Sequence, residues 1–170
     1  KKINNIPMLE ILLRRISLAR QLDKIVVAIP KTKQNDKLEN FIKKKKFVCF
    51  RGSELNVLER YFFAAKKYKA DIIVRITSDN PLTDPKLIDL IVKKIIKEKK
   101  EYVSNGLPNY PLGLGVEAFT YKTLKKIYNS AVSNFHKEHV TAYILDNKKK
   151  FKTTKLKSLN DFSKYRLTVD

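Results

Sequence analysis

The chain has 170 residues, of which 43% are hydrophobic, and this combination suits one folded domain with a sizeable core and excludes global disorder. Lys and Arg number 37 against 17 Asp and Glu, so the formal net charge is +20, as in many proteins that bind nucleic acids or phosphates. The single cysteine, Cys49, excludes an internal disulfide and lies among apolar neighbours, which favours a structural thiol and a cytoplasmic protein. No apolar run is long enough to cross a bilayer, so we expect no membrane partner.

Helices and strands are predicted to alternate along most of the chain. Helical spacing of apolar residues and cap signals predict helices over 7–21, 36–45, from Ser53, 85–99, 122–133 and 137–147. Short apolar or alternating runs predict strands over 24–29, 47–50, 71–76, 102–104, 116–120, 151–159 and 165–169. Strands separated by helices indicate an α/β fold of three layers, with a mostly parallel sheet and right-handed crossovers.

The strand over 71–76 carries the most informative pattern of the chain. It ends in Arg75, Asp79 follows after three residues, and Asp84 before Pro85 is a strong signal for the start of a helix. Open α/β sheets bind ligands at the carboxyl ends of their strands, which places Arg75 and Asp79 where a ligand is expected. The alternative is that Asp79 only caps a turn, as Asp before Asn-Pro often does.

Polar groups follow three other predicted strands, at Arg51-Gly52-Ser53, Ser104-Asn105 and Asp170. Ser53 is expected to cap the next helix, whose N-terminus favours an anion. We expect these groups to converge with Arg75 and Asp79 at one edge of the sheet. Two carboxylates from separate strands suit a Mg²⁺ ion that also holds substrate phosphates, and arginines nearby would clamp the phosphates.

Six motifs occur in a specific order: RGSELNVLERY (51–61), VRITSDNPL (74–82), YVSN (102–105), GLGVE (113–117), EHVT (138–141) and RLTVD (166–170). The series resembles the cytidylyltransferase family of spore-coat polysaccharide biosynthesis proteins, which is related to the CMP-KDO and acylneuraminate cytidylyltransferases. The resemblance covers nearly the whole chain.

The resemblance implies a Rossmann-like, GT-A-like fold of the nucleotide-diphospho-sugar transferases. It also implies an enzyme of surface polysaccharide biosynthesis that transfers CMP from CTP to an acidic sugar, of the 3-deoxy-ulosonic or nonulosonic acid type, and releases pyrophosphate. The partners would then be CTP and the sugar, and a homodimer is compatible with the resemblance. The alternative enzymes are another sugar nucleotidyltransferase and a GT-A glycosyltransferase, since a carboxylate at a strand end would serve any of them.

A basic nucleic-acid-binding module is the alternative from outside the enzymes. The lysines are spread over every predicted helix face instead of forming one stripe, so a solvated lysine surface is the better interpretation and nucleic acid is not an expected partner.

Carried over residue by residue, the resemblance makes Asp79 and Asp170 the ligands of a Mg²⁺ cofactor, and Asp79 and Arg75 catalytic residues. The residues it assigns to the nucleotide are Arg51, Ser53, Arg60 and Arg75. The residues it assigns to the sugar are Asn105, Glu117, His139 and Tyr143. Two other interpretations stay open, namely Arg60 as a solvated helix residue and His139 as a capping or packing residue. His136 is expected to be plain surface.

The chain departs from the family pattern in two ways. The family's basic, Gly-containing nucleotide-binding loop would lie just before Lys1, and the family continues beyond Asp170. We therefore expect residues 1–170 to be a single nucleotidyltransferase domain truncated at the N-terminus and at the C-terminus, and inactive with CTP by itself. Gly115 stands where many relatives have Asp, so the resemblance is weaker for sugar contacts near Glu117.

Overall fold

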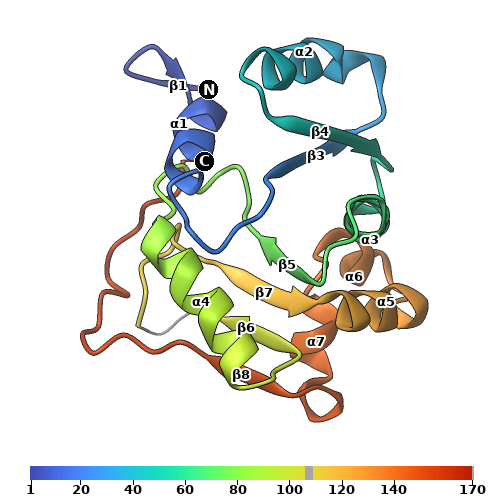
Figure 1. The fold of residues 1–170 in the computed structure, drawn as a ribbon, viewed down its shortest axis with the longest axis vertical. Helices are drawn as coiled ribbons and strands as arrows, with labels where there is room; N and C mark the ends of the chain where they lie inside the picture. The colour runs from blue at the N-terminus through green and yellow to red at the C-terminus, as the bar shows by residue number, and fades with distance from the viewer. Residues whose placement is uncertain (106–108, 170) are drawn as a thin grey trace. The chain divides into compact units, whose positions relative to one another are not determined.

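The computed structural model describes residues 1–105 and 109–169 (Figure 1). By its internal contacts the chain divides into two compact units. Unit 1 comprises Lys1–Asp23, Ile72–Phe119 and Lys152–Asp170. Unit 2 comprises Lys24–Asp71 and Thr120–Phe151.

Unit 1 is built on a sheet with the strand order β5-β7-β6-β8. Its strands are β5 (Ile72–Arg75), β6 (Tyr102–Ser104), β7 (Glu117–Thr120) and β8 (Thr153–Lys155). Strand β6 pairs antiparallel with β7, where Val103 lies opposite Ala118, and parallel with β8, where Val103 lies opposite Thr154. The sheet of unit 1 is therefore mixed, with β7 as its antiparallel member against β6.

Two helices accompany this sheet, α1 (Met8–Ile16) and α4 (Pro85–Lys97). Helix α4 contacts β5 and β6, and α1 contacts α4. The start of α4 is as predicted, since Asp84 accepts a hydrogen bond from the Lys86 N–H and Pro85 occupies the first turn. Its buried stripe is formed by apolar residues at helical spacing, namely Leu87, Ile88, Ile91, Val92 and Ile95.

A short hairpin precedes α1, and the sequence patterns did not predict it. Strands β1 (Lys2–Ile3) and β2 (Ile6–Pro7) pair antiparallel. Asn4 and Asn5 form the turn with φ of 47° and 63°, a left-handed conformation that Asn tolerates better than most residues. Strands of two residues are too short to show an alternating pattern.

Unit 2 contains the parallel pair β3 (Val26–Pro30) and β4 (Val48–Gly52), in which Val26 lies opposite Val48. Its α-helices are α2 (Asp36–Lys44), α3 (Val57–Lys67), α5 (Tyr121–Ser130), α6 (Asn134–Glu138) and α7 (Ala142–Asp146). Two 3₁₀ turns, η1 (Lys33–Asn35) and η2 (Lys148–Lys150), complete it. Helix α3 contacts both strands as well as α5 and α6, so it forms the centre of the unit.

The predicted alternation of helices and strands is confirmed, but several bounds are wrong. The helix expected over 7–21 ends at Ile16, and the strand expected over 151–159 covers only Thr153–Lys155. Three further differences concern the start, the continuity or the existence of an element. The helix expected from Ser53 begins at Val57, because Asn56 is the cap. The helix expected over 137–147 is divided at Val140, whose φ of 33° a continuous helix does not allow. The strand expected over 165–169 is absent from the described part of the chain, where Arg166 forms one isolated bridge with Leu112.

No helix within residues 1–105 and 109–169 combines the length and the apolar character that a bilayer crossing requires.

Candidate functional site

The turn after β5 presents the carboxylate of Asp79. Asn80 donates its backbone N–H to the Thr77 carbonyl at 3.2 Å and its side-chain amide to Thr77 Oγ1 at 3.0 Å. Thr83 is fully buried and donates its hydroxyl to the Asn80 carbonyl at 2.9 Å. The Asp79 side chain is exposed and makes no hydrogen bond or ion pair with any residue the structure describes. Asn80 therefore closes the turn, and the Asp79 carboxylate stays open to solvent.

The C-terminal segment is bonded to this turn. The Val169 N–H donates to the Asp79 carbonyl at 3.1 Å. Asp170, the other predicted Mg²⁺ ligand, lies outside the described residues, and Val169 directly precedes it in the chain. The same segment passes so close to Gly113 that a side chain would not fit, because a Cβ at this position would lie only 2.5 Å from the Leu167 carbonyl carbon.

The groups around Asp79 suit Mg²⁺ better than a metal that is coordinated only by protein side chains. In residues 1–105 and 109–169, no group of three or more His, Cys, Asp or Glu side chains is arranged to hold a metal. Mg²⁺ usually keeps several waters and takes one or two carboxylates together with substrate phosphates. One exposed carboxylate on a hydrogen-bonded turn therefore suits a metal that arrives with a nucleotide.

A second cluster in unit 1 joins Arg75, Glu117 and Tyr102. Arg75 Nη1 lies 2.7 Å from Glu117 Oε2, and both side chains are less than one-fifth exposed. The Tyr102 hydroxyl donates to Glu117 Oε1 at 2.6 Å. Burial, followed by the nearby Glu117 charge, raises the pKa of the Tyr102 hydroxyl far above its usual range. The Glu117 carboxylate is thus oriented from both sides, by a cation and by a neutral hydroxyl.

Tyr102 is a residue of this cluster that the sequence patterns did not single out. The signal was present in the YVSN motif, but the alternation of a strand says only that Tyr102 is buried and not which group its hydroxyl reaches.

Asn105 is fully buried at the end of β6. Its Nδ2 donates to the Leu114 carbonyl at 2.8 Å, and its Oδ1 accepts from the Val116 N–H at 2.7 Å. Both ends of the amide are therefore used to hold the segment that leads into Glu117. A Cβ on Gly115, inside this segment, would have no atom of the described residues within 4 Å.

Arg51 lies in β4 of unit 2 and is held by acidic groups of α2. Its Nη1 lies 2.6 Å from Asp36 Oδ1 and 2.7 Å from Glu39 Oε2, and its Nη2 donates to the Thr32 carbonyl. The hydrogen bonds that Arg51 donates to Asp36 and then to Glu39 raise the pKa of Arg51. The buried Arg51 Nε has no partner among the residues that the structure describes, so the guanidinium keeps one free donor.

Arg60 and Ser53 are in contact at the start of α3. Arg60 Nη1 donates to the Ser53 carbonyl at 2.7 Å, and burial lowers the pKa of Arg60. The interpretation of Arg60 as a solvated surface residue is therefore wrong. Ser53 does not cap α3; its Oγ accepts from the Asn56 N–H at 3.1 Å, and Asn56 in turn caps the helix. Gly52 permits this packing, because a Cβ there would lie 3.0 Å from Arg60 Cγ.

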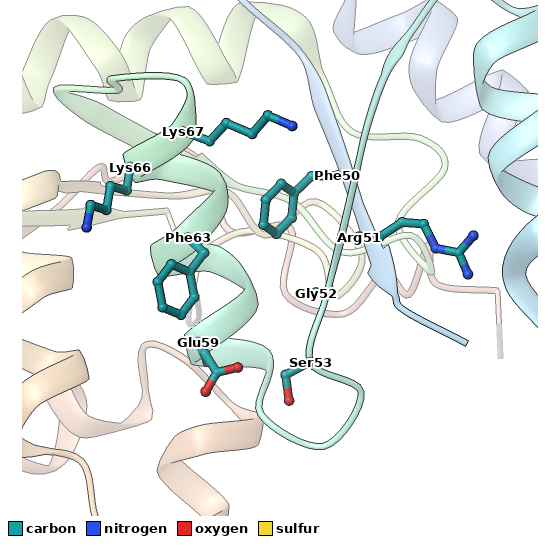
Figure 2. A pocket seen from close by; sticks show the side chains of 8 residues that line it. All are labelled: Phe50, Arg51, Gly52, Ser53, Glu59, Phe63, Lys66 and Lys67. Carbon is teal, nitrogen blue, oxygen red and sulfur yellow. The ribbon is translucent and has the colours of Figure 1, made fainter. Parts of the chain in front are cut away.

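A shallow cleft of about 610 Å³ lies beside β4 and α3. The residues that line it are Phe50, Arg51, Gly52, Ser53, Glu59, Phe63, Lys66 and Lys67. Figure 2 shows the Phe50 ring on the α3 side of β4, whereas the Arg51 guanidinium points to the opposite side. The cleft thus offers aromatic and lysine side chains, with Arg51 only at its border.

His139 and Tyr143, both assigned to the sugar, lie around the break between α6 and α7. His139 is exposed, and its ring centre is 4.6 Å from that of Phe135. The Tyr143 ring is 5.2 Å from His136. The expectation that His136 is plain surface is wrong, because its side chain is 19% exposed and its two ring nitrogens lie 2.9 Å from Ser133 Oγ and from Asp146 Oδ2.

The predicted site residues divide between the units. Unit 1 contains Arg75, Asp79, Asn105 and Glu117, and brings Arg75 into contact with Glu117. Unit 2 contains Arg51, Ser53, Arg60, His139 and Tyr143, and brings Arg60 into contact with Ser53.

Known proteins resemble this chain in sequence and in structure. The cytidylyltransferase family matches residues 1–168. The spore coat polysaccharide biosynthesis protein SpsF of Bacillus subtilis is 31% identical over 96% of this chain and 70% of its own length. The structure of a cytidylyltransferase from Leptospira borgpetersenii is 33% identical and has a TM-score of 0.95. The match includes 99% of this chain and 72% of that one.

A more distant structure shares the fold. The CMP:2-keto-3-deoxy-manno-octonic acid synthetase solved with CTP is 13% identical and has a TM-score of 0.69, over 93% of this chain and 82% of that one. The predicted Rossmann-like fold of the nucleotide-diphospho-sugar transferases is thereby confirmed. The family match over 1–168 and the agreement with the Leptospira structure together lead to one assignment: the chain belongs to the cytidylyltransferase family and is a nucleotidyltransferase.

Proposed function

We propose that this enzyme transfers CMP from CTP to the hydroxyl of an acidic sugar, with release of pyrophosphate, in the synthesis of a surface polysaccharide. Family membership supports the transfer of a cytidylyl group, and the spore coat relative supports a polysaccharide pathway. The synthetase of similar fold is named for a keto-deoxy sugar acid, which supports the acidic acceptor.

The observation that carries the proposal is the turn around Asp79. Its carboxylate is exposed and takes part in no bond within the described ranges, while hydrogen bonds on both sides hold its backbone. We assign Asp79 and Asp170 to Mg²⁺, which when bound neutralises phosphate charge and polarises the attacked phosphorus. An open carboxylate on a rigid turn is the arrangement that this role requires.

The cationic residues are assigned to the phosphates and the nucleotide. Arg75 carries its charge at the end of β5, and its bond to Glu117 orients the guanidinium before any ligand binds. Arg60 holds the Ser53 backbone, and we assign both to the nucleotide together with Arg51. Arg51 would exchange a carboxylate partner for a phosphate, because its Nη1 already binds Asp36 and Glu39.

The sugar side is assigned to Glu117, Asn105, His139 and Tyr143. The second Glu117 oxygen is held by the Tyr102 hydroxyl, so this carboxylate has a fixed direction in which to meet the sugar. Asn105 acts by holding the backbone of Leu114 and Val116 next to Glu117.

The test is the Asp79→Asn variant of the full-length protein. Pyrophosphate release from CTP would be followed with 3-deoxy sugar acids and with neutral sugars as acceptors. We expect turnover to fall at least about a hundredfold, as when a group that stabilises charge is lost from a site. Asp23→Asn is the matched control, because it makes the same change at an exposed residue of unit 1.

Near-normal turnover of Asp79→Asn would refute the assignment of Asp79. Equal use of neutral sugars by the unmodified protein would refute the acidic acceptor, and release from another nucleotide in place of CTP would refute the donor.

A further inference from the structure

Arg15 near the end of α1 binds the segment that follows Asp79. Its Nε donates to the Thr83 carbonyl at 3.2 Å and its Nη2 to the Leu82 carbonyl at 3.3 Å. One planar guanidinium therefore bridges two consecutive carbonyls, 67 and 68 residues away in the chain. A lysine offers a point charge and cannot reproduce this two-armed contact.

The helix that carries Arg15 is itself well anchored. Helix α1 packs on α4, and after it the backbone N–H groups of Arg20 and Gln21 both donate to Asp89 Oδ1, at 2.8 and 2.9 Å. Leu12, Leu13 and Ile16 of the helix are buried. Arg15 therefore connects the turn to a fixed support.

The Asp79 carboxylate depends on its backbone for its direction. It is exposed and has no bond of its own within residues 1–105 and 109–169, so side-chain contacts do not orient it. The turn is held by Thr83 through Asn80, by Val169 at the Asp79 carbonyl, and by Arg15 at Leu82 and Thr83. Loss of any of these contacts should widen the range of directions that the carboxylate samples.

We propose that Arg15 is a positioning residue of the metal site: by bridging the carbonyls of Leu82 and Thr83, it fixes the turn on which Asp79 presents its carboxylate to Mg²⁺. This inference rests on the proposed function, because only there is Asp79 a metal ligand. A ligand that must first be ordered binds its metal more weakly, since the ordering entropy is lost on binding.

The experiment measures metal binding directly. Mn²⁺ replaces Mg²⁺ as a paramagnetic probe, and its dissociation constant is determined by electron paramagnetic resonance on the full-length protein in the presence of CTP. We expect Arg15→Lys to raise this constant about fivefold, the factor that corresponds to one net hydrogen bond. Arg20→Lys is the matched control, because its side chain is exposed on the same segment and should leave the constant unchanged.

Two further variants separate the possible causes. Thr83→Val removes the hydroxyl bond inside the turn without a change to α1, and should raise the Mn²⁺ constant in the same direction. At saturating metal, turnover of Arg15→Lys should stay within about twofold of the unmodified enzyme, because a positioning residue does not touch the reacting atoms. Asp79→Asn should no longer bind Mn²⁺, so the spectrum of unbound Mn²⁺ should persist.

If Asp79→Asn binds Mn²⁺ normally, the metal assignment of the proposed function fails. If Asp79→Asn loses the metal while Arg15→Lys and Thr83→Val bind it as tightly as Arg20→Lys, the proposed function stands and the positioning role of Arg15 is overturned.

Discussion

Arg75 and Glu117 form an ion pair with 2.7 Å between Nη1 and Oε2, although 42 residues separate them in the chain. Strand β5 ends at the first residue and strand β7 begins at the second. The Tyr102 hydroxyl occupies the other carboxylate oxygen, so one acidic group connects three strands of the sheet in unit 1.

The hydrogen bond between Tyr102 and Glu117 should be measurable as a coupling energy. In a double-mutant cycle of Tyr102→Phe and Glu117→Gln, we expect a coupling of about 1–3 kcal/mol in the free energy of unfolding, because the bond is buried and its acceptor is charged. Urea denaturation measures each variant. Tyr165→Phe, at an exposed tyrosine, should change stability by less than about 0.5 kcal/mol. Strictly additive effects of the two variants would contradict the coupling.

The same tyrosine should make stability fall at alkaline pH. The pKa of Tyr102 is raised in the folded protein above the value near 10 that an unfolded tyrosine has. Its stabilising contribution is therefore complete below about pH 10 and is lost as the pH rises further, at up to about 1.4 kcal/mol per pH unit. Denaturation curves between about pH 9 and 11 should show a steeper loss for the unmodified protein than for Tyr102→Phe. Parallel losses in the two proteins would show that other groups cause the decline.

Gly113 and Gly115 should respond very differently to the same substitution. Gly113 has φ of +101°, and a Cβ there would lie 2.5 Å from Leu167 C and 2.6 Å from Thr168 N, so Gly113→Ala should destabilise by at least about 2 kcal/mol. Gly115→Ala meets open space and should stay within about 0.5 kcal/mol. Urea denaturation compares them, and amide exchange at Leu167, whose N–H donates to the Leu112 carbonyl at 2.7 Å, locates the damage. Equal stability of the two variants would contradict this account.

The sequence predicted correctly those helices that have both a clear cap and a continuous apolar stripe. Helix α4 was predicted from the Asp84-Pro85 start and a continuous apolar stripe, and both features are present. The division at Val140 was missed because β-branched Val gives no warning of a positive φ. The prediction of a strand over 165–169 was wrong for another reason. An alternating pattern shows that a segment could form a strand but does not show whether a partner strand lies beside it, and here Arg166 makes only an isolated bridge.

In the candidate site too, local patterns identified some residues and missed others. Arg75 and Asp79 were selected from the end of one apolar strand, a signal that lies entirely in neighbouring residues. Arg15 and Tyr102 were not selected, because their partners, Leu82 with Thr83 and Glu117, lie in distant parts of the sequence.

The α/β class, the family and the residue types available for phosphate and metal chemistry can be recognised without coordinates, because apolar periodicity, caps and ordered motifs are properties of neighbouring residues. Which of these groups already have a partner depends on the three-dimensional packing. Asn105 is bonded to the backbone of Leu114 and Val116, and Arg51 is paired with two carboxylates of α2. The Asp79 carboxylate is exposed and has no partner among the described residues. A buried polar group needs a hydrogen-bond partner within about 3 Å. The packing of the whole unit decides which group that partner is, and the neighbouring residues in the sequence do not.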